Sequence, residues 1–232
     1  MKREERQQPR VTALLACGAV AGPLFITVVL IQDYTRVGFD PRVQLLSQLT
    51  LGDLGFIQRA NFILAGLLNL CYAFGLWKIL HPGRAGTWGP LLIGAYGLGL
   101  VTVGMFTPDP ASGFPPGASA PAQPTPHAMV HALGGLFVFL TLAAALFVFA
   151  RRFRERRDQR WAAYCALTGV LLLTLFFVGL GKPDLSARLL RLDVLFGWGA
   201  ASLIAVRLLR TSKTMSASSR DESIVSAQDG HP

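Results

Sequence analysis

Six long apolar runs constrain the fold of this chain more than any other feature of its sequence. They lie at about residues 11–31, 56–80, 88–106, 127–150, 161–180 and 189–209. An α-helix rises about 1.5 Å per residue, so about 20 apolar residues cross a hydrocarbon core about 30 Å thick. The pattern predicts an all-α, polytopic membrane protein, in which six transmembrane helices form a bundle.

The regions outside the runs divide the chain into three parts. Residues 1–10 form a basic N-terminal segment, residues 11–210 hold the six spans, and residues 211–232 form a tail rich in Ser, Ala, Asp and Gln. A tail of this composition buries too little apolar surface to fold, so we expect it to be disordered. The start of the sixth span is the least distinct boundary, because Arg191 and Asp193 lie near it.

The basic residues predict how the spans are oriented in the membrane. If the N-terminus is inside, 16 of the 22 Lys and Arg residues fall in cytoplasmic segments. Cytoplasmic loops of membrane proteins are enriched in Lys and Arg, so we expect both termini to be cytoplasmic. The same asymmetry accounts for the net charge of +9 without a nucleic-acid partner.

One of the predicted cytoplasmic segments, Arg151–Arg160, holds six arginines. A cluster of this kind attracts the anionic head groups of lipids. Basic loops also fix the topology of neighbouring spans without binding any particular lipid. Both interpretations of this loop stay open.

Small residues are frequent within the apolar runs. In a bilayer, where apolar burial does little to associate helices, small residues let two helices approach closely. Gly97 and Gly134 are candidates for such contacts.

Most of the polar residues of interest lie on the predicted outer side. Ser47 and Asp53 precede the second span, Asn61 lies one or two turns inside it, and Asp193 lies near the outer end of the sixth. Ionisable groups at membrane depth are costly, which raises the chance that they have a function. We expect these residues to gather in a polar cluster at the outer mouth of the bundle.

Two histidines begin the fourth span. Thr125 suits the N-cap of this helix and Pro126 suits its first position. His127 and His131 follow, and residues four apart share one face of a helix. The positive end of the helix dipole opposes protonation of these rings and favours the neutral imidazole that binds metals.

The histidines suggest one specific chemical hypothesis. Together with Asp109, which ends the third span on the same side, they would bind Zn²⁺, and Ser47 or Asp53 would assist a metal-bound water. The protein would then be a metal-dependent membrane hydrolase acting on a lipid or its head group. Two alternatives stay open: a structural network of capping and hydrogen-bonding groups, and a binding or transport site for a small molecule.

Two other classes of membrane protein fit less well. A membrane cytochrome needs pairs of histidines within its spans. Besides His127 and His131 the chain has only His81, in an inner loop, and His231, in the tail, so we expect no heme. A proton-coupled transporter needs ionisable groups near the middle of the bilayer. The first, third, fourth and fifth spans have none there.

The chain resembles a prokaryotic membrane family known as domain of unknown function 998. The resemblance extends from about Val11 to Arg210, and three motifs carry it. They are Ser47-Gln48-Leu49 with Gly52 and Asn61, Gly104-Met105-Phe106-Thr107-Pro108-Asp109-Pro110 with Gly113-Phe114-Pro115, and His131 at the start of the fourth span. The resemblance implies six spans and a location in the cell membrane of a prokaryote. The family has no assigned activity, so the resemblance implies no catalytic role for any residue.

Overall fold

The structure, a computed structural model, describes residues 2–81 and 83–228, and the side chains of residues 9–81, 83 and 86–212. It is built from six long helices and one short 3-10 helix. The helices are α1 (Lys2–Thr35), α2 (Gly55–Leu80), α3 (Arg84–Met105), α4 (Pro126–Glu155), α5 (Gln159–Gly181) and α6 (Pro183–Gln228), and the 3-10 helix is η1 (Leu46–Thr50). All six long helices are long and apolar enough to cross a membrane, and the described residues contain no strand. The predicted six-span, all-α fold is confirmed.

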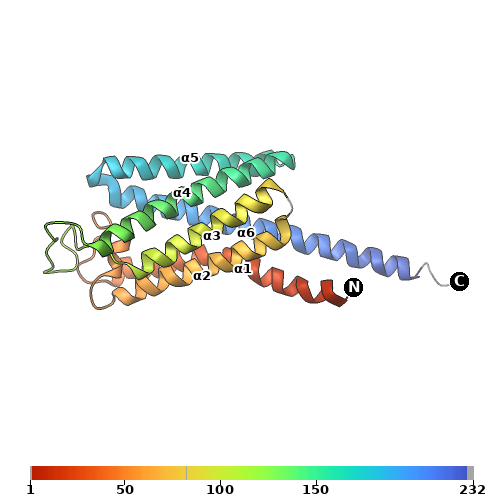
Figure 1. Ribbon diagram of the computed structural model, residues 1–232, viewed down its shortest axis with the longest axis horizontal. Helices are drawn as coiled ribbons and strands as arrows, with labels where there is room; N and C mark the ends of the chain where they lie inside the picture. The colour runs from red at the N-terminus through yellow and green to blue at the C-terminus, as the bar shows by residue number, and fades with distance from the viewer. Residues whose placement is uncertain (1, 82, 229–232) are drawn as a thin grey trace.

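The helices pack in the order of the chain and form a closed ring. Each helix contacts the next one, and α6 packs against α1 to complete the ring, whereas α4 and α6 barely touch. Figure 1 shows the two long loops, residues 36–54 and 106–125, together at one end of the bundle. We call this the long-loop end, and we call the opposite end, from which both termini extend, the terminal end.

The sixth span begins earlier than the sequence predicts. The apolar run indicates a start at about residue 189, but α6 begins at Pro183 and its candidate membrane segment runs from Pro183 to Ser212. Proline is well suited to the first turn of a helix, where no partner is needed for its missing N–H. Arg191 and Asp193 therefore lie inside the helix, where Asp193 is buried and Arg191 pairs with α1.

The structure describes part of the segment after residue 210, which the sequence predicts to be disordered, as helix. Helix α6 continues to Gln228, and Figure 1 shows this part extending beyond the bundle at the terminal end. No Gly or Pro interrupts the sequence from Ala200 to Asp229, so nothing in it ends the helix at the membrane boundary. Met1, Pro82 and residues 229–232, which include His231, lie outside the described residues.

Helices α2 and α3 approach each other through glycine. A Cβ added to Gly97 would lie 2.8 Å from the carbonyl oxygen of Gly66, and one added to Gly66 would lie 2.6 Å from the carbonyl oxygen of Gly97. Real Cβ atoms do not approach a backbone atom so closely. The prediction that Gly97 lies at a close contact between helices agrees with this geometry.

The two long loops fasten to each other through glutamine side chains. Gln44 donates from Nε2 to the carbonyl oxygen of Ser112 at 2.9 Å, and Gln48 donates from Nε2 to that of Ala111 at 2.7 Å. Phe114 of the second loop is buried and meets Phe39 of the first edge to face, with ring centroids 5.2 Å apart. These contacts hold η1 in place at the long-loop end of the bundle.

Candidate functional site

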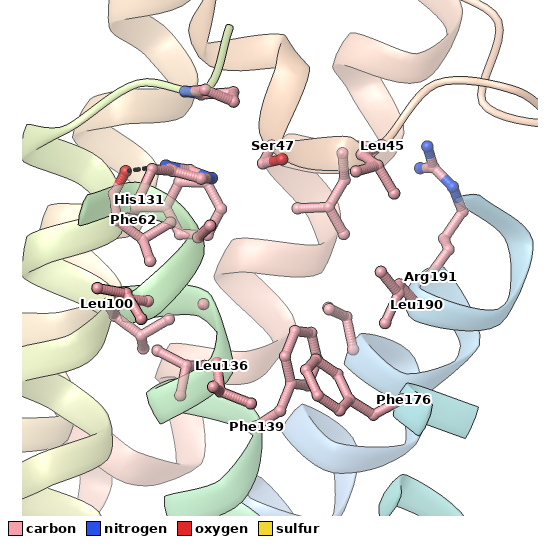
Figure 2. Close-up of a pocket in the computed structure, with 18 of the residues that line it drawn as sticks. Leu45, Ser47, Phe62, Leu100, His131, Leu136, Phe139, Phe176, Leu190 and Arg191 are labelled. Atoms are coloured by element: carbon pink, nitrogen blue, oxygen red, sulfur yellow. Dashed lines mark hydrogen bonds between the residues drawn. The ribbon is translucent and has the colours of Figure 1, made fainter. Parts of the chain in front are cut away.

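A cavity of about 480 Å³ lies within the long-loop half of the bundle. Its walls come from α2, α3, α4, α5 and α6, and Leu45, Leu46 and Ser47 of the first loop and η1 lie at its upper end. Figure 2 shows Ser47, His131 and Arg191 at that end, and Leu136, Phe139 and Phe176 at the other. The cavity is therefore polar at its mouth and apolar at its base.

The cavity lies where α4 and α6 are separated. Those two helices barely touch each other, and α5 packs against both of them. Leu133 and Leu180 line the cavity, and they are 66% and 59% exposed on the lipid-facing surface of the bundle. A molecule dissolved in the bilayer thus meets apolar side chains on its way into the cavity.

His131 is held at the mouth by the end of α3. Its Nδ1 lies 2.7 Å from the carbonyl oxygen of Phe106 and 3.2 Å from that of Val103. Figure 2 shows the other edge of the ring turned toward the side of the cavity where Ser47 lies. The helix that carries His131 begins as expected, because Thr125 accepts from the backbone N–H of Ala128 at 3.2 Å and a proline occupies its first turn.

Asp109 and His127 make separate contacts. Asp109 accepts two hydrogen bonds from Thr125, one from the backbone N–H at 2.9 Å and one from the hydroxyl at 2.7 Å. The carboxylate thereby fixes the N-cap residue of α4. The ring of His127 packs against that of Phe106, with centroids 5.2 Å apart.

These contacts do not fit the zinc site that the spacing suggests. Within the described part of the chain, no group of three or more His, Cys, Asp and Glu residues lies close enough to hold a metal ion. The Nδ1 atom of His131 and both carboxylate oxygens of Asp109 already have partners. His127, His131 and Asp109 are thus neighbours in the fold without forming a set of metal ligands.

Asn61 belongs to a different region, between α1 and α2. It donates from Nδ2 to the carbonyl oxygen of Phe25 at 3.1 Å and to Oε1 of Gln58 at 3.3 Å. Gln58 also accepts from Nε2 of Gln32 at 2.8 Å, and all three polar side chains are buried. This network joins two transmembrane helices by hydrogen bonds.

The charged residues of the sixth helix also face the inside of the bundle. Arg191 forms an ion pair with Asp33 of α1, and its Cζ lies 5.9 Å from the centroid of the Phe39 ring. Asp193 is 1% exposed, and neither of its carboxyl oxygens has a hydrogen-bond partner in the described part of the chain. Its carboxylate acts electrostatically on Tyr96 of α3.

Asp53 remains at the surface of the first loop. Its carboxylate acts on Arg36, whose guanidinium donates to the carbonyl oxygen of Leu51. Burial lowers the pKa of Arg36, and the negative charge of Asp53 opposes that shift. The role visible for Asp53 is thus to support the loop.

The predicted polar residues therefore lie in several places at the long-loop end. Ser47 and His131 share the cavity, Asp109 and His127 lie beside its rim, and Asn61, Asp193 and Asp53 lie apart from it. Gln32, Asp33 and Gln58 are not among the site residues predicted from the sequence. The signal was present, since all three are polar residues at the ends of apolar runs.

Comparison with known proteins supplies a family for the chain. A family model described as a protein of unknown function (DUF998) matches residues 19–207, which cover most of the membrane domain. This match confirms the resemblance that the motifs indicate. No curated protein and no solved structure matches the chain.

Proposed function

This chain belongs to the DUF998 family of integral membrane proteins of unknown function, and we propose that it binds one amphipathic molecule in the cavity at its long-loop end. The hydrocarbon part of that molecule would lie between α4 and α6, and its polar head would lie between Ser47 and His131. The observation that carries the proposal is the coincidence of an apolar cavity with polar side chains at one end only.

The size and lining of the cavity support this function. Its volume of about 480 Å³ falls within the range of about 300–1,000 Å³ found for sites that bind small molecules. From His131 to Phe139 the cavity follows eight residues of α4, which corresponds to a length of about 12 Å. An alkyl chain fits a space of this length, and the exposed rim at Leu133 and Leu180 gives access from the bilayer.

A glycine of α4 allows the cavity to be filled without disturbing the fold. Gly135 lines the cavity, and a Cβ added there would meet no atom within 4 Å. Gly199 of α6 offers the matched control, because an added Cβ meets equally open space there, yet this residue does not line the cavity. The substitutions Gly135→Leu and Gly199→Leu therefore differ in whether they occupy the proposed site.

The test uses a single-chain amphiphile with a photoreactive diazirine in its alkyl chain. The full-length protein is reconstituted in phospholipid nanodiscs, irradiated with the amphiphile and mapped by mass spectrometry. We expect cross-links to residues that line the cavity in the wild type and in Gly199→Leu, and a loss of about fivefold or more in Gly135→Leu. Equal labelling of these residues in all three proteins would refute the proposal.

The location of the protein forms a second part of the proposal. The family resemblance supports a location in the cell membrane of a prokaryote. The positive charge at the terminal end, which includes the Arg151–Arg160 loop, supports cytoplasmic termini. In the same region Arg151, Arg154 and Gln159 line a second hollow of about 360 Å³, which suits an anionic lipid head group. Reporter fusions that are active only in the cytoplasm, placed at each terminus, test the orientation; silent fusions at both ends would reverse it.

A further inference from the structure

The Nε2 atom of His131 has a hydrogen-bonding role that its neighbours determine. Nδ1 lies 2.7 Å from the carbonyl oxygen of Phe106 and 3.2 Å from that of Val103, and carbonyl oxygens only accept hydrogen bonds. Nδ1 therefore carries the proton. No ion pair joins His131 to a carboxylate in the described part of the chain, so the buried ring is neutral and Nε2 is an acceptor.

The cavity carries no uncompensated charge. Arg191 is the only charged side chain among the described residues that line it. Its guanidinium pairs with Asp33 and lies over Phe39, and its Nε and Nη2 atoms are buried without a hydrogen-bond partner in the described part of the chain. The carboxylate of Asp33 thus balances the positive charge of Arg191.

From these two features we infer that the head of the bound molecule is an uncharged hydroxyl group that donates a hydrogen bond to Nε2 of His131, an inference that rests on the proposed function. The hydroxyl of Ser47, which lies across the mouth in Figure 2, offers both a donor and an acceptor to the same head. An ionised sulfate or carboxylate head has no proton to donate to Nε2. Burying its charge in a neutral cavity is also costly. The ligand class is therefore a long-chain alcohol or a neutral lipid with a free hydroxyl.

Three photoreactive compounds with the same alkyl chain test this inference on the wild-type protein in nanodiscs. The first ends in a primary alcohol, the second in its methyl ether and the third in a sulfate. The ether keeps the oxygen but cannot donate, and the sulfate is always charged. One hydrogen bond corresponds to about a fivefold change in binding, so we expect the alcohol to label the cavity about fivefold more strongly than either of the others.

The outcomes separate the inference from the function on which it rests. Equal labelling by alcohol and ether, or strongest labelling by the sulfate, overturns the hydroxyl preference, and the cavity remains a binding site if Gly135→Leu still abolishes labelling. If none of the compounds labels the cavity, or if Gly135→Leu changes nothing, both the proposed function and the inference fail.

A substitution of His131 sharpens the same test. His131→Phe keeps a ring of similar size at the mouth but removes Nε2 as an acceptor. We expect the alcohol to lose its advantage and to label no more than the ether does. The measure is the ratio of alcohol labelling to ether labelling within the variant, so a general change in labelling cancels and only the contribution of Nε2 remains. A variant that keeps both its ether labelling and its alcohol preference contradicts the inference.

Discussion

Glycine residues mark both the most closely packed and the most open part of this bundle. Between α2 and α3, an added Cβ on Gly66 or Gly97 would meet the backbone of the other helix at less than 3 Å. Between α4 and α6, an added Cβ on Gly135 meets nothing within 4 Å and faces the cavity. A small residue in a transmembrane helix thus either brings two helices together or leaves room for another molecule.

Polar groups show the same contrast. We call the part of the bundle around α1, α2 and α3 the closed side, and the part around the cavity between α4 and α6 the open side. Among α1, α2 and α6, Gln32, Gln58 and Asn61 bond to one another and Asp33 pairs with Arg191, so these groups join helices. Their remaining polar atoms, such as Oε1 of Gln32 and Nε2 of Gln58, are buried without a partner in the described part of the chain. On the open side His131 uses one nitrogen for α3 and leaves the other to the cavity. A site for a ligand requires both free hydrogen-bonding capacity and space, and the cavity on the open side offers both.

The largest expected effect concerns the ion pair between α1 and α6. The Asp33 and Arg191 side chains are 5% and 22% exposed, so Asp33→Leu would leave a largely buried guanidinium without its partner. We expect a loss of about 3–5 kcal/mol in the free energy of unfolding, measured by denaturant titration in mixed micelles. The double variant Asp33→Leu with Arg191→Leu should recover most of this loss. If Asp33→Leu alone is as stable as the wild type, the ion pair does not stabilise the packing of α1 against α6.

The second effect concerns the seam between α2 and α3. Gly97→Ala places a methyl group 2.8 Å from the carbonyl oxygen of Gly66, and the two helices must move apart. We expect a cost of about 1–3 kcal/mol in the same titration. Gly94→Ala is the control, because its new Cβ would lie 3.7 Å from the Cβ of Ala73, an ordinary contact. If Gly97→Ala and Gly94→Ala are equally stable, close packing of α2 against α3 at Gly97 does not contribute to stability.

The six spans could be predicted from the sequence, because the thickness and apolar nature of the bilayer determine the length and composition of a membrane-spanning helix. The boundary at Pro183 was missed for a specific reason. Arg191 and Asp193 resemble loop residues until their surroundings inside the bundle are known, and the partner of Arg191 lies 158 positions away in the chain. A contact between residues so distant in sequence leaves no local signal.

Two of the residues named from the sequence, Ser47 and His131, line the cavity, but the arrangement of the polar residues was not predicted. The sequence correctly places Thr125 and Pro126 at the start of the fourth span, because capping is a local interaction. The side-chain partners of Asp109 and His131 depend on how α3 and α4 pack. Periodicity identifies a face of one helix, and it does not say which carbonyl groups of another helix that face will meet.

The third effect tests the hydrogen-bonded network of the closed side. Gln58 is fully buried, and its Oε1 accepts from both Gln32 and Asn61, so Gln58→Leu removes both of these bonds. The bond from Gln32 joins α1 to α2, whereas the bond from Asn61 lies within α2. At about 0.6 kcal/mol for each bond, we expect a loss of about 1 kcal/mol. The control is Asn69→Leu, because Asn69 is also buried but bonds only within its own helix, to Ala65. A greater loss in the control would mean that the network does not hold α1 and α2 together.

The smallest effect compares two adjacent glycines that face opposite sides. A Cβ added to Gly134 would lie 3.2 Å from Cγ2 of Val103 on α3, whereas one added to Gly135 meets open space. Alanine is favoured over glycine inside a helix by about 0.5–1 kcal/mol, so Gly135→Ala should stabilise the ligand-free protein by about 0.5 kcal/mol. In Gly134→Ala the tight contact offsets that gain, and we expect no net change. The two residues are adjacent in α4, so the comparison is made within one turn of the same helix. If Gly134→Ala is more stable than Gly135→Ala, the space beside Gly135 is filled in the native protein. The contrast between the two sides of the bundle would then disappear.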